Sequence, residues 1–334
     1  MYSLPEQIEF AFERRNIPLK EMVAPFKRHY FDESQTNRFF QVEDILGNHY
    51  VVRINGELWP PFTRENEDHN LKCLSNHSLS THVLENDVQN GFQICHLKDK
   101  NHRFTERKHH IANAQQLLQP IALAIKKYHQ IGDFKNQYSV GTALLNAFNR
   151  VTHHQKNKLM AYCNLSLQIF LTLNNDRANF VSSHNDLLPS SVYIEDQQAS
   201  IVDWEYSGEN HRSYDLALFS LKSALTRQEE IDLISYYDPT DQWGMVHSIV
   251  LMKPVVSFLL LLWDLTSPPL HHLTADFLWR AVHTHSQNAW VAQSAKQLTK
   301  EQSLGFFYNK PQAQCKKRNS PSTSSVQNTH LSIN

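Results

Sequence analysis

The stretch FVSSHNDLLPSSVYIEDQQASIVDWEYSGENHRSYDLALFS, residues 180–220, carries most of the information about the fold. It begins with a loop that contains His184 and Asp186, and it continues with a run of β-type residues at 193–202. A second carboxylate, Asp203, follows this run directly. Because a run of this kind predicts a β-hairpin, the two acids are expected at one cleft.

Two carboxylates in one cleft suit phosphoryl transfer. The reaction needs one carboxylate near the attacking hydroxyl and others that hold Mg²⁺ against the phosphates, because catalysis is mostly positioning and neutralisation of charge. Asp186 and Asp203 are the candidates for these two tasks. A histidine and an aspartate separated by one residue are common by chance, so the ordered combination carries the argument.

The segments HNDLLPSS, IVDWEY and SYDLA resemble, in this order, the signature of choline kinases, bacterial amino-alcohol kinases and aminoglycoside phosphotransferases, and bacterial choline-kinase-like proteins most closely. The resemblance implies a two-lobed α+β protein-kinase-like fold with a small antiparallel-sheet N-lobe and a mainly helical C-lobe. It also implies that Asp186 acts as catalytic base or orients the hydroxyl, that Asp203 binds the metal, and that Asp215 is structural. His184 is counted among the predicted catalytic residues, and its expected role is a hydrogen bond that supports the loop rather than proton transfer.

The N-lobe is expected at residues 1–97. A helix is predicted at 5–15 and a second one at 64–74, and strands are predicted near 26–31, 37–43, 49–54, 82–85 and 91–97. Gly47 and Asn48 supply a turn between two of these strands, because both residues tolerate the positive φ of tight hairpins.

Residues 35–54, QTNRFFQVEDILGNHYVVRI, resemble the second and third strands of bacterial choline-kinase-like proteins. The resemblance places Arg53 at the phosphate-contacting position and makes Glu67, in the run RENE, its expected ion-pair partner. No glycine-rich loop is visible at 32–37. The resemblance allows a serine-containing turn instead, in which Ser34, Gln35 and Thr36 are the candidate donors to the phosphates. ATP and Mg²⁺ are the cofactors that the resemblance implies.

The C-lobe is expected at 98–307, after a polar surface linker at 98–108. Within 117–129 the apolar residues recur at helical spacing and predict a core-facing stripe of Leu118, Ile121, Ala122, Ile125 and Tyr128. The segment 308–334 is polar, so a disordered tail is predicted there.

The metal site departs from the family pattern at Ser191, where an asparagine normally binds magnesium. A serine hydroxyl is a shorter and weaker ligand than an amide carbonyl, so reduced activity, or none, is one of the expectations.

For the acceptor, the resemblance assigns Glu205, Tyr206 and Trp263 to the substrate side, and an aromatic wall suits a quaternary ammonium through cation–π attraction. Lys222 stands where the family has a cation-facing glutamate, and Leu260 stands in place of a tryptophan.

Three function hypotheses follow. The first is ATP- and Mg²⁺-dependent phosphorylation of the hydroxyl of choline, ethanolamine or a related amino alcohol. The second keeps the chemistry but has thiamine, an aminoglycoside or another hydroxylated metabolite as acceptor, because Lys222 stands where the family has a cation-facing acid. The third is a catalytically silent kinase-like binding protein, because of Ser191 and the missing glycine loop.

Composition narrows the partners and the location. The chain has 334 residues and a net charge of -1, so no field attracts nucleic acid or an anionic membrane. The four cysteines lie far apart, which fits reduced thiols in a cytoplasmic protein better than disulfides or a zinc site.

The first residues mix charges into the apolar sequence, unlike a signal peptide, and the apolar run at 245–265 contains Lys253 and Pro254. A buried helix is therefore expected there rather than stable membrane insertion. The oligomeric state is left open.

Overall fold

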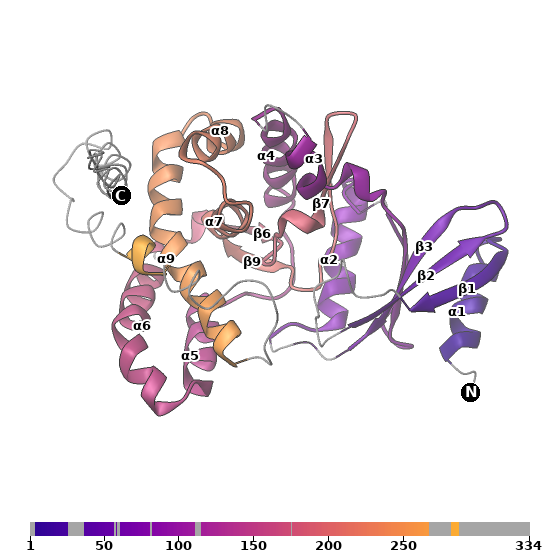
Figure 1. The fold of residues 1–334 in the computed structure, drawn as a ribbon, viewed down its shortest axis with the longest axis horizontal. Helices are drawn as coiled ribbons and strands as arrows, with labels where there is room; N and C mark the ends of the chain where they lie inside the picture. Colours follow the sequence, from indigo (N-terminus) through magenta and orange to yellow (C-terminus); the bar gives the residue numbers. More distant parts are fainter. Residues whose placement is uncertain are drawn as a thin grey trace, which may run out of the picture.

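A computed structural model of the chain describes residues 4–25, 37–56, 58, 61–80, 82–110, 115–174, 176–266 and 282–286. A small lobe with a β-sheet lies at one end of the molecule and a helical lobe at the other, with the helix α2 (Arg64–Asn76) between them (Figure 1). This is the two-lobed α+β fold predicted from the sequence.

The N-lobe consists of the helix α1 and a five-stranded antiparallel sheet in the order β1-β2-β3-β5-β4. Its elements are α1 (Leu4–Glu13), β1 (Leu19–Pro25), β2 (Asn37–Asp44), β3 (His49–Asn55), β4 (Val83–Asp87) and β5 (Phe92–His96). Ile8, Ala11 and Phe12 of α1 pack against the buried residues of the sheet because they recur on one helix face. The strand predicted at 26–31 lies outside the described residues.

The turn between β2 and β3 fixes the position of Arg53. Gly47 adopts φ +83°, a conformation that favours glycine, and the carboxylate of Asp44 accepts the backbone N–H of Asn48 at 2.8 Å. The resulting register pairs Arg53 with Phe39 on β2 and with Gln93 on β5. Arg53 therefore lies in the middle of the sheet.

The helix α2 connects the two lobes. The hydroxyl of Thr63 accepts the backbone N–H of Asn66 at 3.2 Å and caps its N-terminus. Its residues Leu71 and Leu74 are buried in the larger hydrophobic core, that of the C-lobe, whereas α1 and the sheet form a separate smaller core. The division at residue 97 remains a prediction, and the predicted tail at 308–334 lies outside the described residues.

The prediction of a polar surface linker at 98–108 is wrong. The segment contains η1 (Lys100–His102) and most of α3 (Phe104–His110), and Arg103 and Phe104 are buried. The ring of Phe104 packs 5.3 Å from that of Phe219, and Arg103 donates to the Tyr193 hydroxyl at 2.7 Å. Two well-packed side chains anchor the segment although its average composition is polar.

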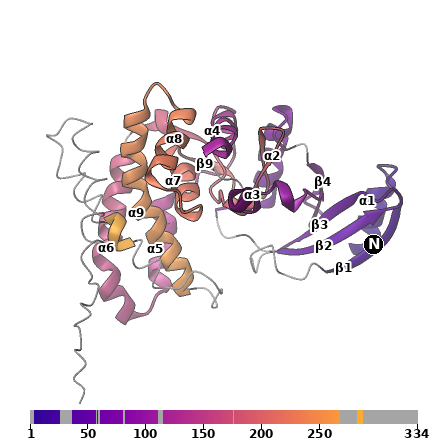
Figure 2. The same ribbon diagram turned by 45° about the horizontal axis from the view of Figure 1, so that its top comes forward.

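The C-lobe is mainly helical and includes two small two-stranded sheets, β6-β9 and β7-β8. Its further elements are α4 (Gln115–His129), α5 (Val140–Arg150), α6 (His153–Leu173), η2 (Arg177–Asn179), β6 (Phe180–Ser183), η3 (Pro189–Ser191), β7 (Val192–Glu195), β8 (Gln198–Ile201), β9 (Gly208–His211), α7 (Ser213–Lys222), α8 (Arg227–Tyr237) and α9 (Gln242–Thr266). The helices α5, α6 and α9 gather at the end farthest from the N-lobe sheet (Figure 2). All members of the predicted stripe on α4 are fully buried, which confirms that prediction.

By length and composition, α9 is the one helix within the described ranges that is long and apolar enough to cross a membrane. Of the most apolar 18-residue stretch of α9, 78% is buried inside the protein. Core helices pass the same test, and the predicted buried helix at 245–265 is confirmed.

Candidate active site

Asp215 on α7 holds the backbone of the loop that leads to Asp186. Its buried carboxylate accepts the backbone N–H groups of His184 at 2.8 Å and of Asn185 at 2.9 Å. Burial raises the pKa of Asp215, but the hydrogen bond and charge of His129 and the backbone N–H of His184 outweigh it, so the pKa lies below its usual value. Asp215 thus remains an ionised acceptor that fixes the loop.

His184 connects this loop to the chain that precedes Asp203. Its Nε2 lies 3.0 Å from the carbonyl oxygen of Val202, and its Nδ1 lies 3.3 Å from the backbone nitrogen of Asp186. Since a carbonyl accepts and an N–H donates, the ring is the neutral Nε2–H tautomer. Burial lowers the pKa of His184, which favours this neutral form. Both ring nitrogens therefore position backbone on either side of the site.

Ser191 belongs to the same framework. It is buried, and its carbonyl accepts the backbone N–H of Val202 at 3.0 Å. Because Val202 immediately precedes Asp203, the structure brings Ser191 and Asp203 to the same end of the β7–β8 hairpin.

Positive φ occurs at two non-glycine residues in the turn of the β7–β8 hairpin and at Asp203, which follows the hairpin. Asp196 and Gln197, in its turn, have φ of 45° and 62°, as a two-residue turn of type I′ requires. Asp203 itself has φ of 71°. A non-glycine residue rarely adopts this conformation, and such residues cluster at functional sites.

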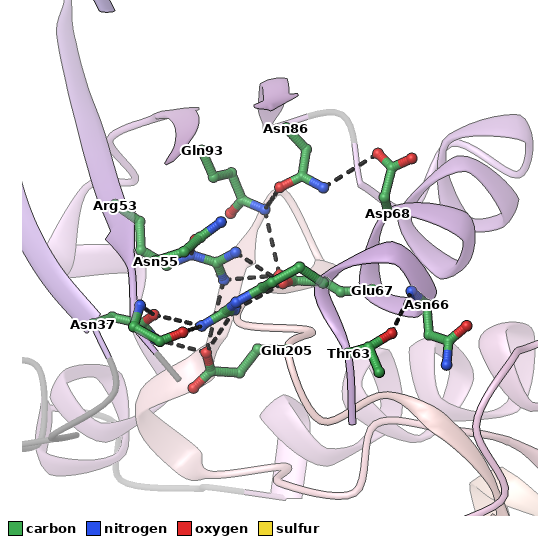
Figure 3. Close-up of polar contacts among 12 residues, drawn as sticks. Asn37, Arg53, Asn55, Thr63, Asn66, Glu67, Asp68, Asn86, Gln93 and Glu205 are labelled. Atoms are coloured by element: carbon green, nitrogen blue, oxygen red, sulfur yellow. Dashed lines mark hydrogen bonds and ion pairs between the residues drawn. The ribbon is translucent and has the colours of Figure 1, made fainter. Parts of the chain in front are cut away.

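On the N-lobe side, Arg53 and Glu67 form an ion pair (Figure 3). Nη1 of Arg53 lies 2.8 Å from Oε1 of Glu67, and Nη2 lies 2.9 Å from Oε2, so the contact is bidentate. The two side chains are 4% and 1% exposed. The structure therefore contains the pair expected between these residues.

Arg64 and Asn37 extend this ion pair to Glu205 in the C-lobe. Nη1 of Arg64 lies 2.8 Å from Glu67 and 3.0 Å from Glu205. Asn37 donates to Glu205 at 2.6 Å and accepts from Arg64 at 2.7 Å. Because Asn37 and Arg64 belong to β2 and α2, whereas Glu205 follows β8, the network joins the lobes.

The charges of Asp203 and Glu205 are only partly compensated. Burial raises the pKa of Asp203, Arg53 lowers it and Glu67 raises it, and the outcome lies above the usual value. Burial and the charge of Asp203 likewise raise the pKa of Glu205, against the effect of Arg53. The ionised forms of both carboxylates are disfavoured, and a dication bound to their oxygens would stabilise those ionised forms. These oxygen donors suit Mg²⁺.

Aromatic side chains adjoin the loop at Asp186. The ring of Phe62 lies 5.3 Å from that of Tyr138 and 5.2 Å from that of Tyr206, and Tyr138 lies 5.6 Å from Tyr214. Burial raises the pKa of Tyr138 and of Tyr214, and the charge of Asp186 adds to the rise. The nearby Tyr214 hydroxyl opposes the rise in the pKa of Tyr138, although within the described part of the chain the Tyr138 hydroxyl makes no hydrogen bond of ordinary geometry.

Of the described residues predicted for the site, Trp263 is not joined to it by these contacts. Ser34 and Thr36 lie outside the described residues. Trp263 is on α9 with 39% of its surface exposed, whereas Tyr206 is half-buried beside Phe62. The pairing of Tyr206 with Trp263 around an acceptor remains a prediction.

The sequence reasoning missed the contacts of Asn37, Arg64 and Tyr138. The spacing of Arg64 and Glu67 offered a signal, because residues three apart share a helix face. Asn37 and Tyr138 offered none, since their contacts depend on how distant segments pack.

The fold and the site together define a protein of the kinase-like class, with an arginine–glutamate pair in one lobe and ordered acids in the other. The chain belongs to the choline/ethanolamine kinase family, which matches residues 29–236. The resemblance seen in residues 180–220 is thereby confirmed.

Similar sequences and solved structures include choline kinases and other phosphotransferases. Protein LicA of Haemophilus influenzae is 23% identical over 200 residues, which are 58% of this chain and 58% of the length of that relative. The crystal structure of choline kinase LicA from Streptococcus pneumoniae has a TM-score of 0.63 at 16% identity, covering 87% of this chain and 99% of the other. LicA in complex with AMP has a TM-score of 0.65 at 17% identity and covers 86% and 98%. Spectinomycin phosphotransferase shares the fold as well.

Proposed function

We propose that this protein transfers the terminal phosphoryl group of ATP to the hydroxyl of choline, ethanolamine or a related amino alcohol. The observation that carries the proposal is the framework in which Asp215, His184 and Val202 hold the segments of Asp186 and Asp203 together. Membership of the choline/ethanolamine kinase family supports the same class of reaction.

In this proposal Asp186 orients the acceptor hydroxyl and takes its proton. The hydroxyl oxygen forms a bond to the γ-phosphorus while the bond from that phosphorus to the β-bridging oxygen breaks, and ADP leaves with the electron pair. Mg²⁺, when bound, neutralises charge on the phosphate oxygens. Asp203 is one residue that would hold it, and Ser191 adjoins the same site.

We assign Glu205 to the metal and phosphate side rather than to the acceptor. Its contacts with Arg64 and Asn37, and the effect of the Asp203 charge on its pKa, support this assignment. Arg53 is proposed to contact the phosphates, because Glu67 holds its guanidinium in one orientation. The AMP complex of LicA supports nucleotide binding as a class property.

On the acceptor side, the aromatic group around Phe62, Tyr138 and Tyr206 suits an organic cation, which aromatic faces attract. The buried Tyr138 hydroxyl, which makes no hydrogen bond of ordinary geometry, can donate to a polar group of the acceptor. A cytoplasmic enzyme with a small-molecule acceptor fits these features, and the proposal involves neither nucleic acid nor membrane insertion.

The test is ADP formation by the purified chain with ATP and Mg²⁺, in the presence of choline, ethanolamine, thiamine or an aminoglycoside. Acceptor-dependent turnover is expected with an amino alcohol, and Asp186→Asn should reduce it by about 10²–10⁴-fold. Asp196→Asn is the matched control, because Asp196 is an exposed turn residue whose positive φ asparagine tolerates.

Turnover with thiamine or an aminoglycoside alone would reassign the acceptor. A folded protein that binds ATP but transfers to none of the four would favour the silent binding protein and overturn the proposal.

A further inference from the structure

Away from the candidate active site, three side chains that commonly bind metals meet where α2 contacts the loop between α4 and α5. His69 and Cys73 lie one turn apart on α2, and Asp133 lies in the loop. One ligand atom from each residue lies within 4.8 Å of the other two. We propose that these residues bind a borderline transition-metal dication, above all Zn²⁺, and that the bound metal fixes α2 to the loop.

The distances already resemble the edges of a zinc coordination tetrahedron. Nε2 of His69 lies 3.5 Å from Sγ of Cys73 and 3.5 Å from Oδ2 of Asp133. Zinc bonds of about 2.3 Å to sulfur and about 2.0–2.2 Å to nitrogen and oxygen, at tetrahedral angles, separate nitrogen from sulfur by ~3.5 Å and nitrogen from oxygen by ~3.4 Å. The sulfur–carboxylate edge, at most 4.8 Å long, would have to close to ~3.6 Å. Two of the three edges thus need almost no movement.

The donor set selects the class of metal. An imidazole, a thiolate and a carboxylate suit Zn²⁺ and similar dications, whereas Mg²⁺ prefers oxygen donors. Lys135 lies 2.9 Å from the other carboxylate oxygen of Asp133, Oδ1, so it can remain bonded there while Oδ2 binds the metal. The metal would therefore compete little with this existing ion pair.

Access to this zinc site is open. The side chains of His69 and Asp133 are 36% and 70% exposed, so a metal can enter and a water can complete the fourth position. The shortest hydrogen bond of His69 Nε2 is to the backbone carbonyl oxygen of Asp133, at 3.0 Å. Metal binding replaces this hydrogen bond and moves the ring proton to Nδ1.

The position of the zinc site gives it a structural consequence. The helix α2 also bears Glu67, the partner of Arg53, and Asn70 of α2 already accepts the backbone N–H of Lys135 at 2.7 Å. A metal would strengthen this attachment of α2 to the loop. Spacing along the chain did not reveal the site, because Asp133 lies 60 residues after Cys73 (133 − 73).

Titration of the untagged full-length protein with Co²⁺ tests the proposal, because thiolate ligation produces a charge-transfer absorption band. The band should reach its maximum at one Co²⁺ per chain. Added Zn²⁺, but not Mg²⁺, should displace the Co²⁺ and remove the band. Cys73→Ser should remove the band, and His69→Ala or Asp133→Asn should weaken binding by at least about tenfold, the loss that even indirect metal contacts produce. Two control variants should leave the band unchanged. His77→Gln replaces the exposed histidine that caps the C-terminus of α2, and Cys95→Ser replaces a cysteine of β5.

A second readout does not depend on absorption. Zn²⁺ should slow the reaction of Cys73 with a thiol reagent by about tenfold or more in the wild type and much less in Asp133→Asn. A band of equal strength in Cys73→Ser, or the absence of both the band and the protection in a folded wild type, would overturn the proposal. Neither readout depends on phosphoryl transfer, so its outcome is separate from that of the proposed function.

Discussion

The buried pair of Arg53 and Glu67 offers a quantitative test of the inter-lobe network. Glu67→Gln keeps the shape of the side chain but removes its charge, and Arg53 then retains Glu205 at 4.0 Å as its nearest remaining ion partner. Removing one partner of a buried ion pair costs about 3–5 kcal/mol, because the other charge stays buried without compensation. Since Glu205 and Asp203 still attract Arg53, we expect the lower end, about 3 kcal/mol.

This loss corresponds to a decrease in Tm of about 6–12 °C, at about 2–4 °C per kcal/mol for a large domain. Thermal unfolding followed by circular dichroism measures it. Glu85→Gln is the control, because Glu85 pairs with the half-exposed Arg14 and Arg15, and pairs of this kind contribute about 0–1 kcal/mol.

A double-mutant cycle isolates the pair itself. Arg53→Met combined with Glu67→Gln removes both charges, so the double variant should be about 2–3 kcal/mol more stable than the sum of the two single losses predicts. The reasoning is refuted if Glu67→Gln unfolds at the same temperature as Glu85→Gln, or if the two single losses simply add.

The pH dependence of the Glu67→Gln loss follows from the pKa of Glu67. Burial raises this pKa, but Arg53 and Arg64 lower it further, so the folded-state pKa lies below its usual value. A carboxyl group with a lowered folded-state pKa stabilises the protein above its unfolded pKa, and this stability is lost as the pH falls through the folded pKa. The difference between the wild type and Glu67→Gln should therefore shrink at acidic pH.

Three further predictions concern the candidate active site. Asp203 has a raised folded-state pKa, so its stability contribution is present at low pH and lost as the pH rises through that pKa. In metal-free buffer at neutral pH, Asp203→Asn should therefore raise Tm by about 2–4 °C, while phosphoryl transfer is lost. A lower Tm for this variant would contradict the prediction. Asp215 has a lowered folded-state pKa, so Asp215→Asn should destabilise the protein by about 1–3 kcal/mol at neutral pH and by less at acidic pH, which urea unfolding at several pH values measures; a loss independent of pH would count against an ionised Asp215. Tyr138→Phe removes a buried hydroxyl that makes no hydrogen bond of ordinary geometry, so the free energy of unfolding should change by no more than about 1 kcal/mol, whereas KM for the acceptor but not for ATP should rise; an unchanged acceptor KM would separate Tyr138 from the acceptor.

Local patterns in the sequence predicted the elements that depend on local forces. The stripe on α4 follows from helical spacing, and the β2–β3 hairpin follows from Gly47, whose positive φ the turn requires. The wrong linker at 98–108 shows the limit of this approach, because Phe104 is fully packed within a polar segment. Composition averages over such a residue, whereas burial depends on what it meets in three dimensions.

The contacts of the candidate site divide in the same way. Arg53 and Glu67 were paired through the family resemblance, and Arg64 was within reach of a spacing argument. The bond between Asn37 and Glu205 joins residues 168 positions apart. Contacts of this range depend on how the lobes pack, which no pattern of one segment contains.

Direct detection of the phosphorylated product tests the central claim most closely. The purified chain is incubated with ATP, Mg²⁺ and choline or ethanolamine, and the phosphoryl ester is measured by mass spectrometry beside Asp186→Asn and Asp196→Asn. The account predicts phosphocholine or phosphoethanolamine from the wild type and from Asp196→Asn, with almost none from Asp186→Asn. Equal product from Asp186→Asn, or no ester from a folded wild type that binds ATP, would contradict it.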